Sequence, residues 1–179
     1  FSSRRRHTGL LTVTGVQTCA LPIWLAAVLD AKARAALNRL LLTRTLETIE
    51  AWRGDLECCA VVSPCEEALA CARAAGAQAL REPAGAGLNA ALAFAAARIA
   101  ERGGAKLLVV ACDLPRLSAA ALHAFVPRAD GMMCAAIAPD RSGLGTNALA
   151  LALDAGARDV FHFGADSCAR HRAALDRKS

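Results

Sequence analysis

Apolar runs of strand length alternate with segments of helical length along residues 30–175. The clearest run is Lys106–Cys112, which is apolar after its first residue and therefore suits a strand buried on both faces of a sheet. Strands separated by single helices predict right-handed crossovers between parallel neighbours, with helices on both faces. We therefore predict a three-layer α/β/α domain with a mostly parallel sheet. Helices are expected at 30–52 with Asp30 as the cap, at 66–75 with Gly76 as the left-handed residue after the helix, at 87–102, from Ser118 and from 166 or 167. Strands are expected at 57–62, 77–81, 106–112, 133–138 and 147–153.

The two ends of the chain do not match this pattern. Residues 1–23 end in a segment that resembles a translated sequencing-library adapter, and residues 176–179 match the translated complement of the same adapter. A secretory signal peptide is the alternative, with Arg4–Arg6 as its basic start, but polar residues and Pro22 interrupt the apolar stretch that it needs. We expect both ends to be adapter-derived and residues 24–175 to hold the native domain.

The net charge of residues 24–175 is small. The whole chain has 21 Lys and Arg against 16 Asp and Glu, a formal charge of +5. Without the two ends, 16 basic and 15 acidic residues remain. This balance does not indicate a nucleic-acid-binding protein. No apolar run reaches the roughly 18 residues of a transmembrane helix, so no membrane partner is expected either.

The cysteines do not form a regular pattern. Once Cys19 is set aside, seven remain, and none of them forms a CxxC pair. Zinc sites and disulfide frameworks need more regular spacings. We expect reduced cysteines, with Cys58, Cys59, Cys112 and Cys134 buried as small apolar residues within strand-like runs. A cytoplasmic location follows from this expectation.

Ligands of open α/β sheets bind beyond the carboxyl ends of the strands, so the loops that follow the strands are the candidate site. One Gly-rich turn leads into a helix at Gly87, Leu88 and Asn89, which could approach a phosphate or a base edge. A plain glycine turn is the alternative. Asp113 directly follows the clearest strand and could hold Mg²⁺ together with substrate phosphates. A helix cap is the alternative for Asp113, but Ser118 already supplies that cap.

Two further segments could bind an anion. In the loop that ends at Thr146, two glycines, an arginine and the Thr146 hydroxyl could surround an anionic substrate, with a glycine hairpin as the alternative. Gly164 and Ser167 lie at a helix start, where free N–H groups favour a carboxylate or a phosphate. His171 is one turn further on the same face as Ser167. From spacing alone, a serine cap and a surface histidine are the better interpretation of this last segment.

Four motifs occur in order, namely GLNAAL from Gly87, DLP from Asp113, APDRSGLGTNAL from Ala138 and FGADSCARH from Phe163. Together they resemble the 2-phospho-L-lactate guanylyltransferase family of deazaflavin coenzyme F-420 biosynthesis. Some bacterial members of that family use phosphoenolpyruvate or 3-phosphoglycerate. The resemblance covers essentially all of residues 24–175, and the last two motifs are its specific part. It implies an enzyme with a Rossmann-like, glycosyltransferase-A-like nucleotidyltransferase sheet.

The resemblance also implies a reaction and a site. The reaction is Mg²⁺-dependent transfer of GMP from GTP to a small phosphorylated carboxylic acid, with release of pyrophosphate and no covalent nucleophile from the protein. By motif position, the nucleotide would be bound by Gly87, Leu88 and Asn89. Mg²⁺ would be bound by the catalytic residue Asp113. The phospho-acid would be bound by Thr146, Gly164 and Ser167. The partners are therefore GTP and the acid, whose identity stays open, and a homodimer is allowed.

Departures from the family bear on activity. Other members begin with a strand and a basic VPVK-type loop, which is not found before Leu25, so the sheet is expected to have its first strand missing. An acidic LDxDTPEDL-like segment follows the last motif in other members and is not found here. Cys168 replaces a common Phe, and Ser63-Pro64-Cys65 replaces a common Ser-Asp-Asp. We therefore expect this chain as written to be marginally stable and to have negligible activity.

Two other interpretations stay open. One is a different nucleotidyltransferase of the same fold, such as a molybdenum-cofactor cytidylyl- or guanylyltransferase. Competition between GTP and CTP separates that interpretation from the first. The other is a non-catalytic Rossmann-like binding module, which would be excluded if Asp113→Ala abolished turnover while the fold was retained.

Overall fold

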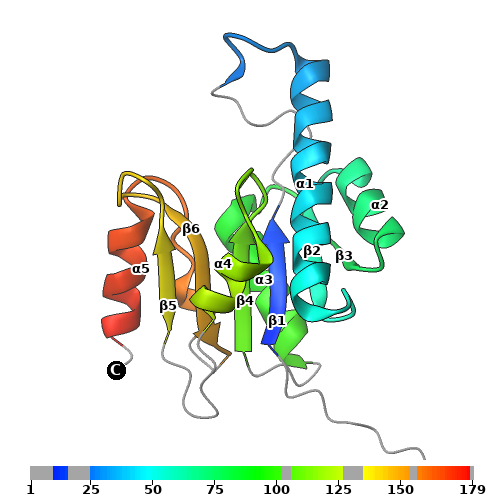
Figure 1. Cartoon of the computed structure of the whole chain (residues 1–179). Coiled ribbons are helices and arrows are strands. Elements are labelled where there is room, and N and C mark those ends of the chain that lie inside the picture. The colour runs from blue at the N-terminus through cyan, green and yellow to red at the C-terminus, as the bar shows by residue number, and fades with distance from the viewer. Residues whose placement is uncertain (1–9, 16–24, 102–105, 127–134, 154–156, 178–179) are drawn as a thin grey trace, which may run out of the picture.

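The computed structural model describes residues 10–15, 25–101, 106–126, 135–153 and 157–177 of the chain. They form alternating strands and helices around one six-stranded sheet (Figure 1). The strands are β1 Leu10–Gly15, β2 Cys59–Ser63, β3 Gln78–Arg81, β4 Lys106–Ala111, β5 Ala136–Pro139 and β6 Thr146–Ala152. The helices are α1 Ala31–Arg53, α2 Glu66–Ala74, α3 Gly87–Glu101, α4 Ala119–Phe125, α5 Ser167–Asp176 and the short 3₁₀ helix η2 Ala157–Val160.

The strand order in the sheet is β3-β2-β1-β4-β6-β5. The strands β1 to β4 pair in parallel, whereas β6 pairs antiparallel with both β4 and β5. The prediction of a mostly parallel α/β sheet is confirmed, with β6 as the exception. Because β6 runs against β4, the start of β6 at Thr146 lies at the edge of the sheet where β4 ends.

The expectation that the sheet lacks its first strand is wrong. Leu10–Gly15 forms β1 in the middle of the sheet, between β2 and β4. It pairs with β4 from Leu10 opposite Lys106 to Gly15 opposite Ala111, and also with β2. The physical reason is the sequence Leu-Leu-Thr-Val-Thr, which is rich in residues that favour strands. This strand lies within the residues expected to be adapter-derived, and it leaves no unpaired edge between β2 and β4.

Helices cover both faces of the sheet, because alternate residues of each strand point to opposite sides. Figure 1 shows α1 and α4 in front of the sheet and α3 behind it. The core on the α1 and α4 side includes Leu46, Ile49, Val61, Leu108, Val110 and Leu122. The core on the α3 side includes Leu92, Ile99, Leu107, Val109, Leu149 and Phe161. The predicted three-layer architecture is confirmed.

The helix ends follow from local sequence. The Asp30 carboxylate caps α1 by accepting a hydrogen bond from the Ala33 N–H at 2.7 Å. The Ser118 hydroxyl oxygen caps α4 by accepting one from the Ala121 N–H at 3.2 Å. Both caps were predicted from the sequence. At its other end, α1 stops at Gly54, whose φ of 93° is in the left-handed region that favours glycine.

Most described cysteines are free thiols, as expected. They are Cys58, Cys59, Cys71, Cys112 and Cys168. Cys59 and Cys112 are buried as expected, whereas Cys58 precedes β2 and is only half-buried. Burial raises the pKa of the Cys59 thiol to about 12, so this group stays protonated at neutral pH. Cys65 is disulfide-bonded, which the expectation of reduced cysteines did not include. Cys134 lies outside the described residues, as does Cys19.

Within the described part of the chain, no helix combines the length and the apolar character needed to cross a membrane.

Candidate functional site

The candidate site lies along one edge of the sheet. The parallel strands β1 to β4 end there, and so does β5, because both β4 and β5 run against β6. This edge is at the top of Figure 1, where the loop after β4, the β5–β6 loop and the start of α5 lie. The four motifs of the sequence therefore meet at the edge where open α/β sheets bind ligands.

Asp113 is exposed in the turn that follows β4. Its backbone is positioned from α1, because the buried Thr45 donates a hydrogen bond from its hydroxyl to the Cys112 carbonyl at 3.3 Å. Leu114, the next residue, packs against the core on the α1 side. Since Ser118 caps α4, the Asp113 carboxylate is not needed for that role.

A metal site at Asp113 would depend on ligand oxygens. Among the described residues, no group of three or more His, Cys, Asp or Glu side chains is placed to hold a metal ion. Mg²⁺ commonly takes one or two carboxylates together with substrate phosphates and water. Asp113 is a single carboxylate at a strand end, so it could bind Mg²⁺ together with substrate phosphates. It could not hold a metal ion without such additional ligands.

Removing the Thr45 hydroxyl should loosen the backbone at Asp113. We expect Thr45→Val to lower the free energy of unfolding by about 1–2 kcal/mol, because the buried Cys112 carbonyl loses a donor. Thr45→Ser keeps the hydroxyl and serves as the control. Urea unfolding measures both. A valine variant as stable as the wild type, with an unchanged amide signal at Asp113 in NMR spectra, would show that this bond does not position the turn.

The predicted nucleotide loop begins α3. Gly87 has a φ of +70°, and its N–H donates to the Glu82 carboxylate at 3.1 Å. Leu88 is half-buried and packs against the core on the α3 side. The Asn89 side chain bonds to the backbone of Phe163: its Nδ2 donates to the Phe163 carbonyl at 3.0 Å, and its Oδ1 accepts from the Phe163 N–H at 2.7 Å.

The side chain of Asn89 therefore joins two motifs. One of its N–H groups and one of its lone pairs are used by Phe163, which leaves one of each for a base. The sequence prediction that Asn89 contacts the nucleotide stays a prediction. The contact of Glu82 with Gly87 was not predicted from sequence, because Glu82 lies five residues before the helix starts and so outside the usual capping positions.

Asp140 organises the β5–β6 loop. Its carboxylate accepts hydrogen bonds from the Ser142 hydroxyl at 2.8 Å and from the Leu144 N–H at 3.1 Å. These bonds, with Ser142 first and the backbone N–H groups of the loop after it, hold the pKa of Asp140 below its usual value. A Cβ at Gly145 would lie 2.7 Å from Asp140 Oδ2, so a larger residue here would have to displace the Asp140 carboxylate. Thr146 follows this loop as the first residue of β6, and its side chain is buried.

The start of α5 lies against this loop. The Cys168 N–H donates to the Leu144 carbonyl at 2.9 Å. Gly164 has a φ of 131° and Asp166 a φ of 54°, so the chain turns sharply before the helix begins at Ser167. The expected serine cap is wrong: Ser167 is the first helical residue with a buried side chain, and the cap residue is Asp166, which makes no side-chain cap bond. The structure thus brings Thr146, Gly164 and Ser167 to one corner of the edge.

His171 is not at the surface, which corrects the interpretation from spacing. It is fully buried, and its Nδ1 lies 2.9 Å from the Thr146 Oγ1. The backbone N–H of His162 donates to its Nε2 at 3.0 Å. Burial, followed by the charge of His162, lowers the pKa of His171 to about 4. No local sequence signal indicated this burial, because it depends on contacts with Thr146 and with the backbone of His162.

The low pKa of His171 should make the fold sensitive to acid. The unfolded chain takes up a proton below about pH 6.5, whereas the folded chain does so only below about pH 4. The stability that the neutral imidazole contributes is therefore present above pH 6.5 and is lost as the pH falls through 4, by about 3 kcal/mol in total. Urea unfolding at pH 7 and pH 4 measures this loss. His171→Gln cannot titrate and should lose less stability over this range, and an equal loss in both proteins would contradict the assignment.

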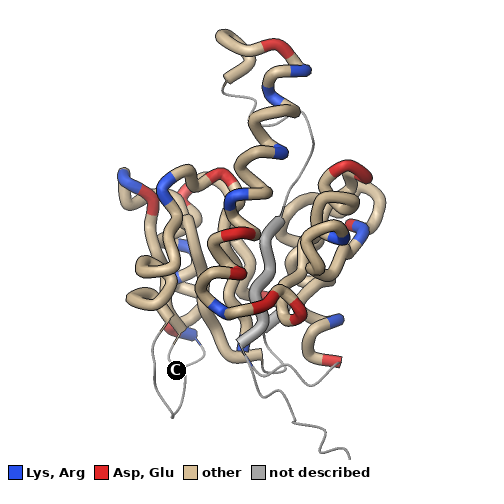
Figure 2. Tube along the Cα trace, turned by 45° about the vertical axis from the view of Figure 1, so that its right-hand side comes forward, with Lys and Arg blue, Asp and Glu red and all other residues tan. Residues whose placement is uncertain are grey.

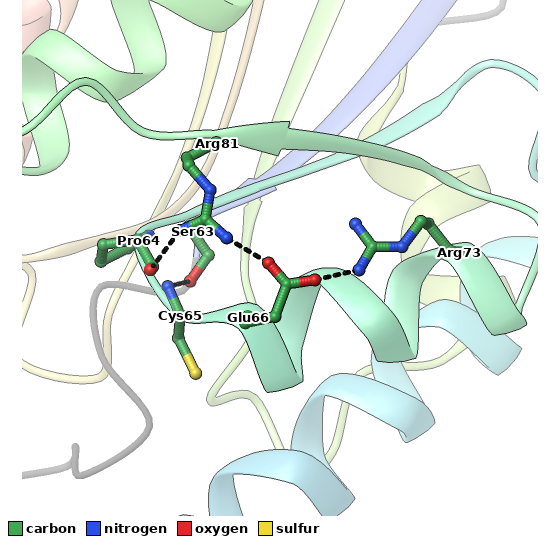
Figure 3. Close-up of polar contacts among 6 residues, drawn as sticks. All are labelled: Ser63, Pro64, Cys65, Glu66, Arg73 and Arg81. Atoms are coloured by element: carbon green, nitrogen blue, oxygen red, sulfur yellow. Dashed lines mark hydrogen bonds and ion pairs between the residues drawn. The ribbon is translucent and has the colours of Figure 1, made fainter.

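An ion-pair cluster lies beside the ends of β2 and β3 (Figure 3). Glu66, at the start of α2, lies between Arg73 and Arg81 and pairs with both. Its pKa is lowered, first by the hydrogen bond from Arg73. Arg81 also donates to the Pro64 carbonyl at 3.0 Å. Because Glu66 engages both arginines, we assign no ligand to this corner.

The edge also carries positive charge. The N-terminal half of α1 extends beyond the end of β1 (Figure 1), and in Figure 2 it carries basic residues without an acid between them. Lys32, Arg34 and Arg39 lie in this half, and Arg44 follows just past the middle of the helix. The acids Glu47 and Glu50 lie only in the second half of the helix. This distribution favours anionic ligands at the edge.

Residues 31–177 match the family model of the MobA-like NTP transferase domain. The chain is 42% identical over 128 residues to a phosphoenolpyruvate guanylyltransferase from Rubrobacter xylanophilus, a match that covers 71% of this chain and 60% of the relative. It is 38% identical over 152 residues to a 3-phospho-D-glycerate guanylyltransferase from Phenylobacterium zucineum, covering 83% of this chain and 67% of the relative. The first match therefore spans less than two thirds of its relative.

The fold is shared with a solved structure of low sequence identity. A protein from Desulfovibrio desulfuricans G20, provisionally described as a nucleotide-diphospho-sugar transferase, superposes with a TM-score of 0.72 at 16% identity. The superposition covers 93% of this chain and 75% of that protein. The expected nucleotidyltransferase architecture is confirmed.

Proposed function

We propose, since this chain belongs to the MobA-like NTP transferase family, that its full-length protein is a guanylyltransferase acting on a small phosphorylated carboxylic acid. GMP would pass from GTP to 2-phospho-L-lactate, phosphoenolpyruvate or 3-phosphoglycerate. The names of its relatives from Rubrobacter xylanophilus and Phenylobacterium zucineum support the last two. From the sequence resemblance we propose that the reaction belongs to deazaflavin coenzyme F-420 biosynthesis. Because GTP is a cytoplasmic metabolite, we propose a cytoplasmic location, and a homodimer is compatible with it.

One observation carries the proposal. The antiparallel direction of β6 brings Thr146 to the edge where β4 presents Asp113. The buried Ser167 reaches the same edge through the contact between the start of α5 and the β5–β6 loop. A carboxylate suited to a metal–phosphate complex thus shares one edge with hydroxyl and N–H groups suited to an acidic ligand. Nucleotidyl transfer needs both ligands side by side.

The proposed reaction needs positioning rather than a protein nucleophile. A phosphate oxygen of the acid attacks the α-phosphorus of GTP, the bond from that phosphorus to the β-phosphate oxygen breaks, and pyrophosphate leaves. Asp113 would hold Mg²⁺, which neutralises phosphate charge when bound. Gly87, Leu88 and Asn89 would bind the nucleotide. Thr146, Gly164 and Ser167 would hold the phospho-acid.

A substrate panel tests the proposal. The full-length protein is incubated with GTP or CTP and with each of the three phospho-acids, and pyrophosphate release is measured. We expect release only with GTP and one or more of the acids. Equal rates with CTP would favour a molybdenum-cofactor-type transferase, and no release with any pair would favour a binding module. The 179-residue chain is assayed in parallel, because its expected negligible activity stays a prediction.

A further inference from the structure

His171 connects the acceptor side of the candidate site to the segment before α5. Its two ring nitrogens face different partners, Thr146 Oγ1 at 2.9 Å from Nδ1 and the His162 N–H at 3.0 Å from Nε2. The ring is fully buried, and the edge of the Phe163 ring packs on it with centroids 4.7 Å apart and an interplanar angle of 69°. The two hydrogen bonds and the contact with the Phe163 ring therefore fix the orientation of the imidazole.

The backbone of His162 decides where the imidazole proton lies. A backbone N–H can only donate, so Nε2 of His171 must accept and cannot carry a proton. A neutral imidazole then carries its single proton on Nδ1. Nδ1 faces the Thr146 hydroxyl oxygen, which accordingly accepts this hydrogen bond. Burial of the ring keeps it neutral at pH 7, as its lowered pKa also indicates.

We propose that His171 is a positioning residue that makes Thr146 a hydrogen-bond donor toward the phosphorylated acid. A hydroxyl can donate only one proton. Because its oxygen accepts from His171 Nδ1, the Thr146 hydrogen is directed away from the ring and would be donated to another acceptor, which in this proposal is the ligand. Ionised carboxylate and phosphate oxygens only accept, so a fixed donor favours them over ligands that need an acceptor. The proposal rests on the proposed function, in which Thr146 binds the acceptor substrate.

Asn89 positions the backbone next to His162. Its side chain bonds to both backbone groups of Phe163, and the next residue toward the N-terminus is His162, which supplies the N–H to His171. Asn89 belongs to the start of α3, where the nucleotide is proposed to bind. The donor role of Thr146 is thereby linked to the nucleotide loop through Asn89, Phe163 and His171.

Two substitutions of His171 separate the donor role from packing. In His171→Gln, the amide oxygen can reach the Nε2 position and accept from His162, but no donor remains for Thr146. In His171→Asn, the amide N–H can take the place of Nδ1–H, but His162 loses its acceptor. We expect the Gln variant to bind phosphoenolpyruvate or 3-phosphoglycerate about tenfold more weakly and the Asn variant within about threefold of the wild type. GTP affinity should change less than about twofold in both.

Two further measurements keep the test decisive if a His171 variant does not fold. Nitrogen NMR of the wild-type full-length protein, without substrate, should find the proton on Nδ1 of His171. Thr146→Ser should keep acid affinity within about threefold, whereas Thr146→Val should lose about tenfold or more. Calorimetry measures GTP and acid affinities separately for every protein.

The outcomes distinguish this proposal from the proposed function. A wild-type protein that binds none of the acids overturns the proposed function and the donor role with it. Wild-type acid binding combined with a proton on Nε2, or with equal losses of acid affinity in the Gln and Asn variants, overturns the positioning role alone. Weaker acid binding in the Gln variant, with GTP affinity kept, supports it.

Discussion

Replacing Asp113 with alanine in the full-length protein is expected to lower kcat for GMP transfer roughly a thousandfold, with the fold unchanged. Asp113 is the acid at the end of the buried strand β4, and its side chain is exposed at the candidate edge. Its loss would remove the protein ligand proposed for Mg²⁺ and with it the neutralisation of charge on the transferring phosphate. Stability should hardly change, because Ser118 and not Asp113 caps α4. Steady-state kinetics and urea unfolding measure the two effects.

Asp55→Ala is the matched control for this substitution. Asp55 is also an exposed aspartate, but it precedes β2 and therefore lies toward the opposite edge of the sheet. Its replacement should leave kcat within about twofold. Equal kcat values for the Asp113 variant and the wild type would show that this carboxylate takes no part in the reaction, and the metal role would be withdrawn.

A proline at Thr12 is expected to destabilise the fold by about 3 kcal/mol or more. Thr12 lies within the central strand β1, opposite Cys59 of β2 and Leu108 of β4. Proline has no backbone N–H and is poorly tolerated in a central strand, where it removes a hydrogen bond of the ladder. Deletion of residues 1–15 should be still more damaging, because β2 and β4 would lose the strand that joins them. Urea unfolding followed by circular dichroism measures both changes.

Thr12→Val is the control for the proline variant. Valine keeps the backbone N–H and the β-branched shape, so its free energy of unfolding should stay within about 1 kcal/mol of the wild type. A proline variant that unfolds at the same urea concentration as the wild type would show that Leu10–Gly15 is not part of the sheet. The prediction from sequence that the sheet lacks its first strand would then be correct.

Most of the fold could be predicted because its signals are local. The Asp30 and Ser118 caps, the apolar run of β4 and the turn at Gly76 depend on neighbouring residues. The direction of β6 could not be predicted, because the loop and the strand pairing set it and not the residue pattern. β1 was not predicted, because residues 1–23 were interpreted as adapter-derived although Leu10–Gly15 contains residues that favour strands.

The candidate site was predicted less completely. Asp113 and Thr146 stood out because each adjoins a strand end. The buried state of His171 depends on residues far away in the sequence, Thr146 among them, so spacing on its own helix favoured a surface position. The contact between Asn89 and Phe163 joins residues 74 positions apart and leaves no local signal.

The most direct test follows the α-phosphate of GTP. The full-length protein is given GTP labelled at that phosphate together with phosphoenolpyruvate, 3-phosphoglycerate or 2-phospho-L-lactate, and the products are identified by mass spectrometry. We expect the label in a guanosine diphosphate ester of the acid, with unlabelled pyrophosphate released in equal amount. Label that stays in GTP in the presence of all three acids, or an equally fast transfer of CMP from CTP, would contradict the assignment of this family member as a phospho-acid guanylyltransferase.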